Sequence, residues 1–187
     1  MALDWIAGHK PKAGHEAEFQ EIVATLFWDK LGTADRTAAS RAGRNRLPRA
    51  LFGRTSAVRQ PSAALRQRYD EIGILASDTL GRSRSADDAS EGAALSFRAQ
   101  GLTAATAIIG DHLLRACYEI KYAPDLSAFG NALLVRAGAF AKAKALDVPA
   151  VPPADPASPE GQLHIVDAAG RWCRFWGDRG HLLVPSF

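Results

Sequence analysis

The sequence predicts an α+β domain, with a four- to five-stranded antiparallel or mixed sheet and three or four helices packed mainly on one face. Three patterns favour this class. Apolar residues recur at helical spacing in three segments, alternate with polar residues in two others, and form three short runs between turn residues near the C-terminus. We expect residues 1–187 to form a single domain, because that length is typical of one domain.

The first predicted element is a strand at residues 3–7, followed by the turn GHKPKAG at residues 8–14. A helix is predicted over residues 15–31, because its apolar residues share one helical face. They are Phe19, Ile22, Val23, Leu26 and Phe27. Glu16 and Glu18 lie in its first turn, where the helix dipole favours acidic side chains.

The middle of the chain contains one clear helix and one ambiguous stretch. Ser62 is a typical N-cap for a helix that ends near Gly81. The apolar face of this helix would consist of Leu65, Tyr69, Ile72 and Leu75. Residues 86–110 fit either a helix or a strand, and both remain open. Residues 114–122 alternate apolar and polar side chains, which favours a strand.

The C-terminal third predicts a long helix, a connector and a small sheet. The helix would run from Leu126 to about Leu146, with apolar residues at helical spacing. Residues 147–161 contain five prolines and are interpreted as an extended surface connector. Three short apolar runs separated by turn residues predict a C-terminal β-meander: residues 163–166, 171–176 and 181–184.

Two stretches of the chain share an order of features. WIAGHKPKAGHEAEF and RACYEIKYAPDLSAF each place a predicted strand, a lysine, a turn and a helix whose first core residue is Phe. Two such units would suit half of a ferredoxin-like sheet. The GHKPKAGHEAEF stretch also resembles the opening of dimeric α+β-barrel proteins. The arginine-rich insertion and the predicted C-terminal strands depart from that family, so the resemblance implies no functional residues here.

The composition is that of a chain that can bury a core. Hydrophobic residues make up 47% of it, and the longest apolar runs fall far short of the ~20 residues of a membrane-spanning helix. The first residues lack the charge, apolar run and cleavage site of a signal peptide. Cys117 and Cys173 make neither a disulfide framework nor a zinc set. We therefore expect a soluble protein of the reducing cytoplasm.

The strongest functional signal is a run of positive charge. Between residues 36 and 68 the chain has nine arginines and no acid, although the net charge of the whole chain is only +3. The planar guanidinium of arginine binds carboxylate and phosphate through paired hydrogen bonds. We interpret residues 32–61 as an arginine-rich insertion that binds a partner. The arginines expected to make the contact are Arg41, Arg44, Arg46, Arg49 and Arg54.

The expected partner of these arginines is an acidic protein surface or the protein itself, rather than nucleic acid. No recognised nucleic-acid-binding motif accompanies the arginines, and only Phe52 and Tyr69 are available nearby to stack on bases. No membrane partner is expected. The predicted function is therefore that of a small binding or interaction protein without a cofactor.

The alternative is a small-molecule-binding module or an enzyme, with a pocket between the sheet and the helices. The pocket residues would be His9, His15, His112 and Tyr118. The chain has no GxSxG, HExxH or glycine-rich phosphate loop, so the sequence leaves open whether the protein is an enzyme. We predict no metal site, because His9 and His15 lie in a turn rich in glycine and lysine with no matching ligand pair elsewhere.

Overall fold

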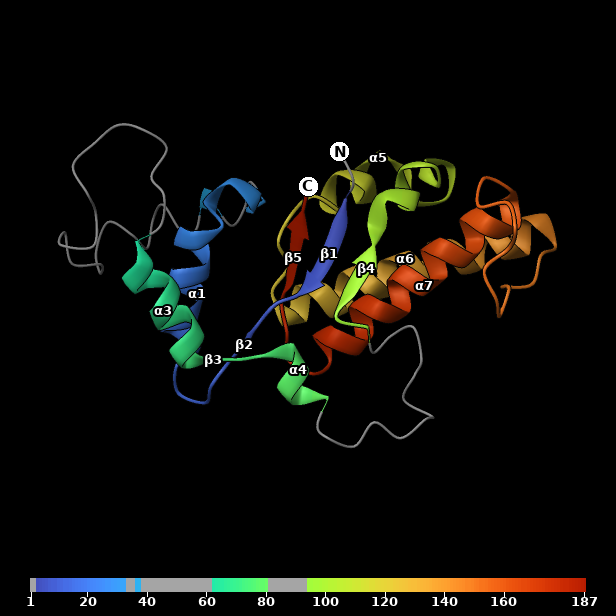
Figure 1. The fold of residues 1–187 in the computed structure, drawn as a ribbon. Helices are drawn as coiled ribbons and strands as arrows, with labels where there is room; N and C mark the ends of the chain where they lie inside the picture. Colours follow the sequence, from blue (N-terminus) through green and yellow to red (C-terminus); the bar gives the residue numbers. More distant parts are fainter. Residues whose placement is uncertain (1–2, 33–35, 38–61, 81–93) are drawn as a thin grey trace.

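A computed structural model describes residues 3–32, 36–37, 62–80 and 94–187, which form a body of sheet and helices and a smaller helical lobe beside it (Figure 1). The body contains β1 (Asp4–Ala7), β4 (Ser96–Arg98), a 3-10 helix (Ala99–Thr103), α5 (Thr106–Ala116), α6 (Ala123–Lys144), α7 (Pro159–Gly177) and β5 (Leu183–Ser186). The lobe contains α1 (Glu16–Leu26), a 3-10 turn (Trp28–Lys30) and α3 (Ala63–Ile72). Between body and lobe lie β2 (Lys10–Pro11), β3 (Gly73–Ile74) and the short helix α4 (Ala76–Thr79).

The sheet of the body has three antiparallel strands in the order β4-β1-β5. Trp5 lies at its centre, paired with Phe97 on one side and Pro185 on the other. The Trp5 side chain is fully buried, with its ring centroid 5.8 Å from that of Phe129 on α6 and 6.1 Å from that of Trp172 on α7. One face of the sheet therefore packs on α6 and α7, as Figure 1 shows.

Helices α6 and α7 run side by side and approach closely because glycines line their contact (Figure 1). A Cβ atom placed on Gly130 would lie 2.8 Å from the carbonyl oxygen of Gly170. A Cβ atom on Gly177 would lie 2.4 Å from the hydroxyl oxygen of Ser127. Real Cβ atoms do not come this close to other heavy atoms, so the spacing of the two helices depends on these glycines.

The core of the lobe confirms the apolar face predicted for α1 and most of that predicted for α3. Leu75 is the exception, because α3 ends at Ile72 instead of near Gly81 and the Leu75 side chain is exposed. Phe19, Ile22 and Val23 of α1 are buried against α3, while Leu26 and Phe27 are partly buried at the edge of the same cluster. Ser62 caps α3 as predicted, since its hydroxyl accepts a hydrogen bond from the backbone N–H of Leu65. The α3 side of the cluster consists of Leu65, Tyr69 and Ile72, and the body adds Ile120 and Leu182.

A short two-stranded antiparallel sheet connects the lobe to the body. In it, Lys10 of β2 pairs with Ile74 of β3, and Pro11 pairs with Gly73. The backbone N–H of Lys12 extends the pairing by donating to the carbonyl of Ile72 at 2.8 Å. We call β2 and β3 the neck. It brings the start of the chain beside the end of α3, more than fifty positions further on.

The predicted fold class was wrong in its proportions. In the described residues the larger sheet has three strands instead of four or five, and six helices are present instead of three or four. The helices also do not gather on one face, because α1 and α3 form a lobe of their own beside the sheet (Figure 1). Of the predicted strands, β1 and β5 formed. The stretch that the sequence left open contains, in its described residues, the strand β4, a 3-10 helix and the start of α5.

The predicted C-terminal β-meander was wrong as well, because residues 159–177 form the single helix α7. The predicted strand at 114–122 was also wrong. Its first residues end α5, and of the rest only Lys121 makes an isolated bridge, to Leu183. The predicted ferredoxin-like half sheet is therefore wrong too, because its second unit needed a strand at residues 114–122. The long helix that follows is α6, close to its predicted bounds.

Candidate functional site

The arginines of the predicted binding segment, Arg41, Arg44, Arg46, Arg49 and Arg54, lie outside the described residues. The chain on both sides is described. Gly32 follows the 3-10 turn after α1, and Ser62 begins α3. Since α1 and α3 pack against each other, the two described residues that flank the segment, Gly32 and Ser62, both lie at the lobe.

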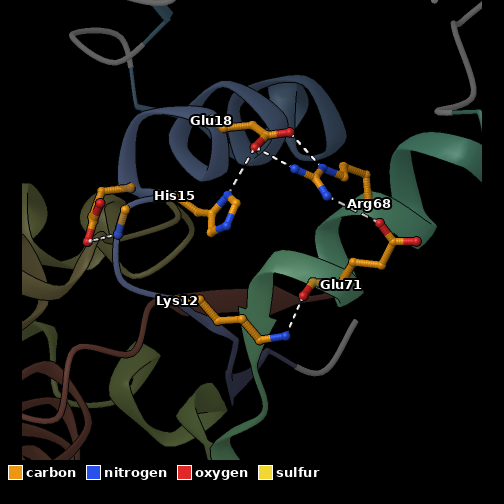
Figure 2. Close-up of polar contacts among 7 residues, drawn as sticks. Lys12, His15, Glu18, Arg68 and Glu71 are labelled. Carbon is orange, nitrogen blue, oxygen red and sulfur yellow. Dashed lines mark hydrogen bonds and ion pairs between the residues drawn. The ribbon is translucent and has the colours of Figure 1, made fainter.

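A chain of polar contacts fastens the two helices of the lobe (Figure 2). Arg68 of α3 donates to both carboxylate oxygens of Glu18 on α1, at 2.7 and 2.9 Å. Glu18 is also 3.3 Å from Nδ1 of His15, and Arg68 also contacts Glu71. These bonds hold the pKa of Glu18 below its ordinary value, with the hydrogen bond from Arg68 as the largest cause. The pairs are exposed, so their contribution to stability is small.

Two arginines at the margins of the positively charged run are engaged within the protein itself. Arg68 pairs with Glu18, as described, and Arg36 donates from Nη2 to the backbone carbonyl of Asp29 at 2.6 Å. Part of the positive charge thus serves to join segments of the lobe.

The four residues of the predicted pocket lie on separate elements. His15 is the N-cap of α1, His112 is exposed on α5, and the Tyr118 ring after α5 meets Phe187 edge-on at 5.8 Å. His9 lies between β1 and β2. Each of the four side chains is therefore described at a different place in the fold.

A cluster of side chains joins the neck to the lobe and the body, and we call His9, Tyr69, Thr79 and His181 the histidine joint. The His9 ring stacks on the Tyr69 ring, with centroids 4.4 Å apart and planes 15° apart. The backbone N–H of His9 donates to the Tyr69 hydroxyl at 3.3 Å. Nδ1 of His9 is enclosed without a hydrogen-bond partner among the described residues, 3.8 Å from a carboxylate oxygen of Asp70.

The second histidine of the joint is completely buried and bonded through both ring nitrogens. Nδ1 of His181 is 2.8 Å from the carbonyl oxygen of Gly8, at the end of β1. Nε2 of His181 is 2.7 Å from the hydroxyl oxygen of Thr79, in α4. One ring therefore links three parts of the chain: the strand β1, the helix α4 and the turn before β5.

Both histidines of the joint favour the neutral ring. Burial lowers the pKa of His9 from its ordinary value, and the nearby carboxylate of Asp70 opposes this only in part. Burial is also the largest cause that lowers the pKa of His181. Burial also raises the pKa of the Tyr69 hydroxyl to about 12. At neutral pH the joint is thus an uncharged, hydrogen-bonded cluster.

The two cysteines are both buried and free. Burial raises the pKa of the Cys117 thiol to about 12, an effect that nearby Lys121 opposes only in part. Burial also raises the pKa of Cys173 well above its ordinary value. Nucleophilic attack and metal binding need the thiolate, which these environments disfavour. We interpret both cysteines as core residues.

Comparison with known proteins gave no match to a family model, to a curated protein or to a solved structure. Function is therefore inferred from the residues themselves. Among residues 3–32, 62–80 and 94–187, no three His, Cys, Asp or Glu side chains converge as a metal site requires. The helices of the same ranges include none that combines the length and the hydropathy of a membrane span.

We expect protein purified without a histidine tag to contain no stoichiometric zinc, nickel or iron. His15 pairs with Glu18, and His9 is stacked on Tyr69, so each ring already has structural contacts. Elemental analysis by mass spectrometry measures the metal content directly. A stoichiometric metal that disappears in the His9→Ala, His15→Ala double variant, but not in the control His112→Ala, would contradict this expectation.

Sequence reasoning identified His9 but missed the other residues of the joint. His181 was assigned to the beginning of a strand, and Thr79 and Gly8 carried no signal at all. The reason is distance along the chain, because the two bonds of His181 span 173 and 102 positions. The register of β1 with β5 brings Gly8 beside His181, and α4 brings Thr79.

Proposed function

We propose that the protein is a small, non-catalytic binding protein that uses its arginine-rich segment to bind the acidic surface of another protein. The observation that carries this proposal is the charge itself: nine arginines and no acid between residues 36 and 68. Charge of one sign gathered in one segment raises the rate and the strength of encounters with an opposite charge.

The lobe supports the proposal by providing a base for the segment. The segment follows Gly32 and precedes Ser62, the described residues next to the 3-10 turn after α1 and to α3. The packing of α1 on α3 buries Phe19 and Tyr69, and Arg68 and Glu18 link the surfaces of the two helices. The same contact illustrates the chemistry proposed for the partner, since Arg68 binds a carboxylate through two hydrogen bonds. The free, buried cysteines suit the cytoplasm, where we expect the protein to act.

The experiment is a titration with defined polyanions, followed by fluorescence anisotropy. The probes are fluorescein-labelled poly-glutamate, duplex DNA and single-stranded RNA, each at ~50 mM and ~200 mM salt, because contacts with phosphates weaken steeply over this range. We expect poly-glutamate to bind. Binding of nucleic acid alone, with a steep dependence on salt, would replace the acidic protein with nucleic acid as the partner.

Two variants with equal loss of charge locate the binding surface. The segment variant carries Arg44→Ser, Arg46→Ser and Arg49→Ser, and the control carries Arg115→Ser, Arg136→Ser and Arg174→Ser on α5, α6 and α7. At ~0.5–1 kcal/mol for each lost contact, the segment variant should bind about tenfold more weakly or worse. Equal weakening in both variants would show that overall charge, and not the segment, attracts the probe.

Self-association is a separate outcome of the same set of proteins. Sedimentation velocity of the unchanged protein and of the segment variant, without any probe, measures it. An oligomer that dissociates in the segment variant alone would make a second copy of the chain the acidic partner. A monomer in both cases leaves the partner as a different protein.

A further inference from the structure

We propose that the histidine joint is a pH-sensitive fastening, which holds β3 and α4 on the body while its rings are neutral and releases them when the rings take up protons. The inference is independent of the arginine-rich segment. It begins from the position of the joint, because His181 is the residue through which α4 is hydrogen-bonded to the turn before β5.

The hydrogen bonds of His181 determine which tautomer of its neutral ring fits. The carbonyl oxygen of Gly8 can only accept, so Nδ1 of His181 carries the proton that it donates. In the neutral ring Nε2 is then the acceptor, and the hydroxyl of Thr79 donates to it. A second proton on Nε2 would force that hydroxyl to turn its hydrogen toward the carbonyl of Leu75, which is 3.4 Å away. These hydrogen bonds fit the neutral ring and also leave a protonated ring bonded at both nitrogens, so what disfavours the second proton is the burial of the ring.

The charges around His181 also disfavour a second proton. The charged groups that act on it among the described residues are Lys10 of β2, Arg179 of its own turn, and His9 when protonated. All of them are cationic. The groups in direct contact with the ring are uncharged, namely the edge-on ring of Trp176, the hydroxyl of Thr79 and the carbonyl of Gly8. A protonated His181 would thus be a buried cation among other cations, which is costly.

The surroundings of His9 also disfavour a proton on its ring, but less strongly than those of His181. Its ring lies between Tyr69 and Gly73, where an added Cβ on Gly73 would be only 2.7 Å from Nδ1. The carboxylates of Asp70 and Asp78 favour a proton on His9, while burial disfavours it. Asp70 is largely exposed, which screens its effect. His9 and His181 disfavour each other's proton, so the first proton hinders the second.

The sign of the pH dependence follows from these environments. Both histidines have a lower pKa in the closed joint than the ordinary value of 6.5, so the closed joint binds fewer protons than the open one. Their contribution to stability is therefore fully present above pH 6.5 and is lost as the pH falls below it. The joint should loosen in mildly acidic solution.

The test is amide hydrogen exchange, measured by mass spectrometry at about pH 7.5 and about pH 5.5 and corrected for the intrinsic exchange rate. Peptides over residues 73–80 report on the joint, and peptides over α6 serve as the internal reference. We expect protection of residues 73–80 to fall at the lower pH, by up to about tenfold for each histidine, because pH 5.5 lies about one unit below the ordinary pKa of 6.5. Protection of α6 should not change.

Variants separate the joint from other histidines. His181→Asn keeps a donor for Gly8 but cannot be protonated, so the pH effect on residues 73–80 should shrink to the smaller part that His9 contributes. His112→Asn, on the surface of α5, should behave as the unchanged protein does. If His181→Asn loses protection everywhere, His9→Asn is the deciding variant and should show a reduced pH effect. The proposal is wrong if the unchanged protein shows no pH effect, or if the effect is undiminished in the variant that decides.

Discussion

Replacing Phe19 by alanine should destabilise the protein by ~3–5 kcal/mol, the usual cost of removing a fully buried phenylalanine ring. Phe19 is only 2% exposed, and its ring stacks on Tyr69 with centroids 5.2 Å apart. Tyr69 in turn holds His9, so the cavity would reach the histidine joint as well as the lobe. A loss of this size is a large part of the stability of an ordinary domain.

Urea denaturation of Phe19→Ala and of a neighbouring control measures this loss. Gln20→Ala changes the adjacent, exposed position of α1 and should shift the free energy of unfolding by less than about 0.5 kcal/mol. If Phe19→Ala shifts it no more than the control does, the ring is not buried and the packing of α1 on α3 is wrong.

The same substitution, glycine to alanine, should have opposite effects at two positions of α6. At Gly130 the new Cβ would lie 2.8 Å from the Gly170 carbonyl and 2.9 Å from Cβ of Cys173, and backbone cannot move aside cheaply. Overpacking of this kind costs ~1–3 kcal/mol. At Gly138 a Cβ meets nothing within 4 Å, so alanine should stabilise the helix by ~0.5–1 kcal/mol.

Thermal or urea denaturation of the two variants, each with one added methyl group on the same helix, decides between packing and helix propensity. The contact of α6 with α7 predicts that Gly130→Ala lowers the stability of the protein and that Gly138→Ala raises it. If both variants were more stable than the unchanged protein, the helices would lie further apart than the glycines imply.

The helices with one apolar face were predictable from the sequence. In α1, α3 and α6 the buried residues recur every three or four positions, and the N-cap of α3 had its serine. Because this spacing of apolar residues is local and regular, such helices can be predicted without any knowledge of the fold.

Helix α7 was not predicted because it is buried around much of its circumference. Its polar stripe is narrow and includes Asp167, Arg171 and Arg174. Its Val, Trp and Phe residues therefore stand in short apolar runs, which are typical of strands. The start signal was nonetheless present. Ser158 caps the helix by accepting a hydrogen bond from Gly161, and Pro159 occupies the first turn. Weighing that signal above the short apolar runs would have favoured a helix.

Two features of the candidate sites were predictable from the sequence, because they depend only on charge or on neighbouring residues. A run of arginines is visible in any fold, and His9 stands out in its turn. The spacing of α6 and α7 depends on glycines, which a search for apolar residues ignores. The bonds of His181 depend on residues more than a hundred positions away. Such contacts become visible only after the strands are in register.

Charge reversal in the arginine-rich segment tests the proposed binding function most directly. The measurement is the affinity for fluorescein-labelled poly-glutamate at ~50 mM salt, where surface charges are weakly screened. One variant carries Arg44→Glu, Arg46→Glu and Arg49→Glu, and its control carries Arg115→Glu, Arg136→Glu and Arg174→Glu, with the same net charge. We predict that the segment variant loses binding while the control keeps most of it. Retained binding in the segment variant, or equal loss in both, would contradict the assignment of function to the segment.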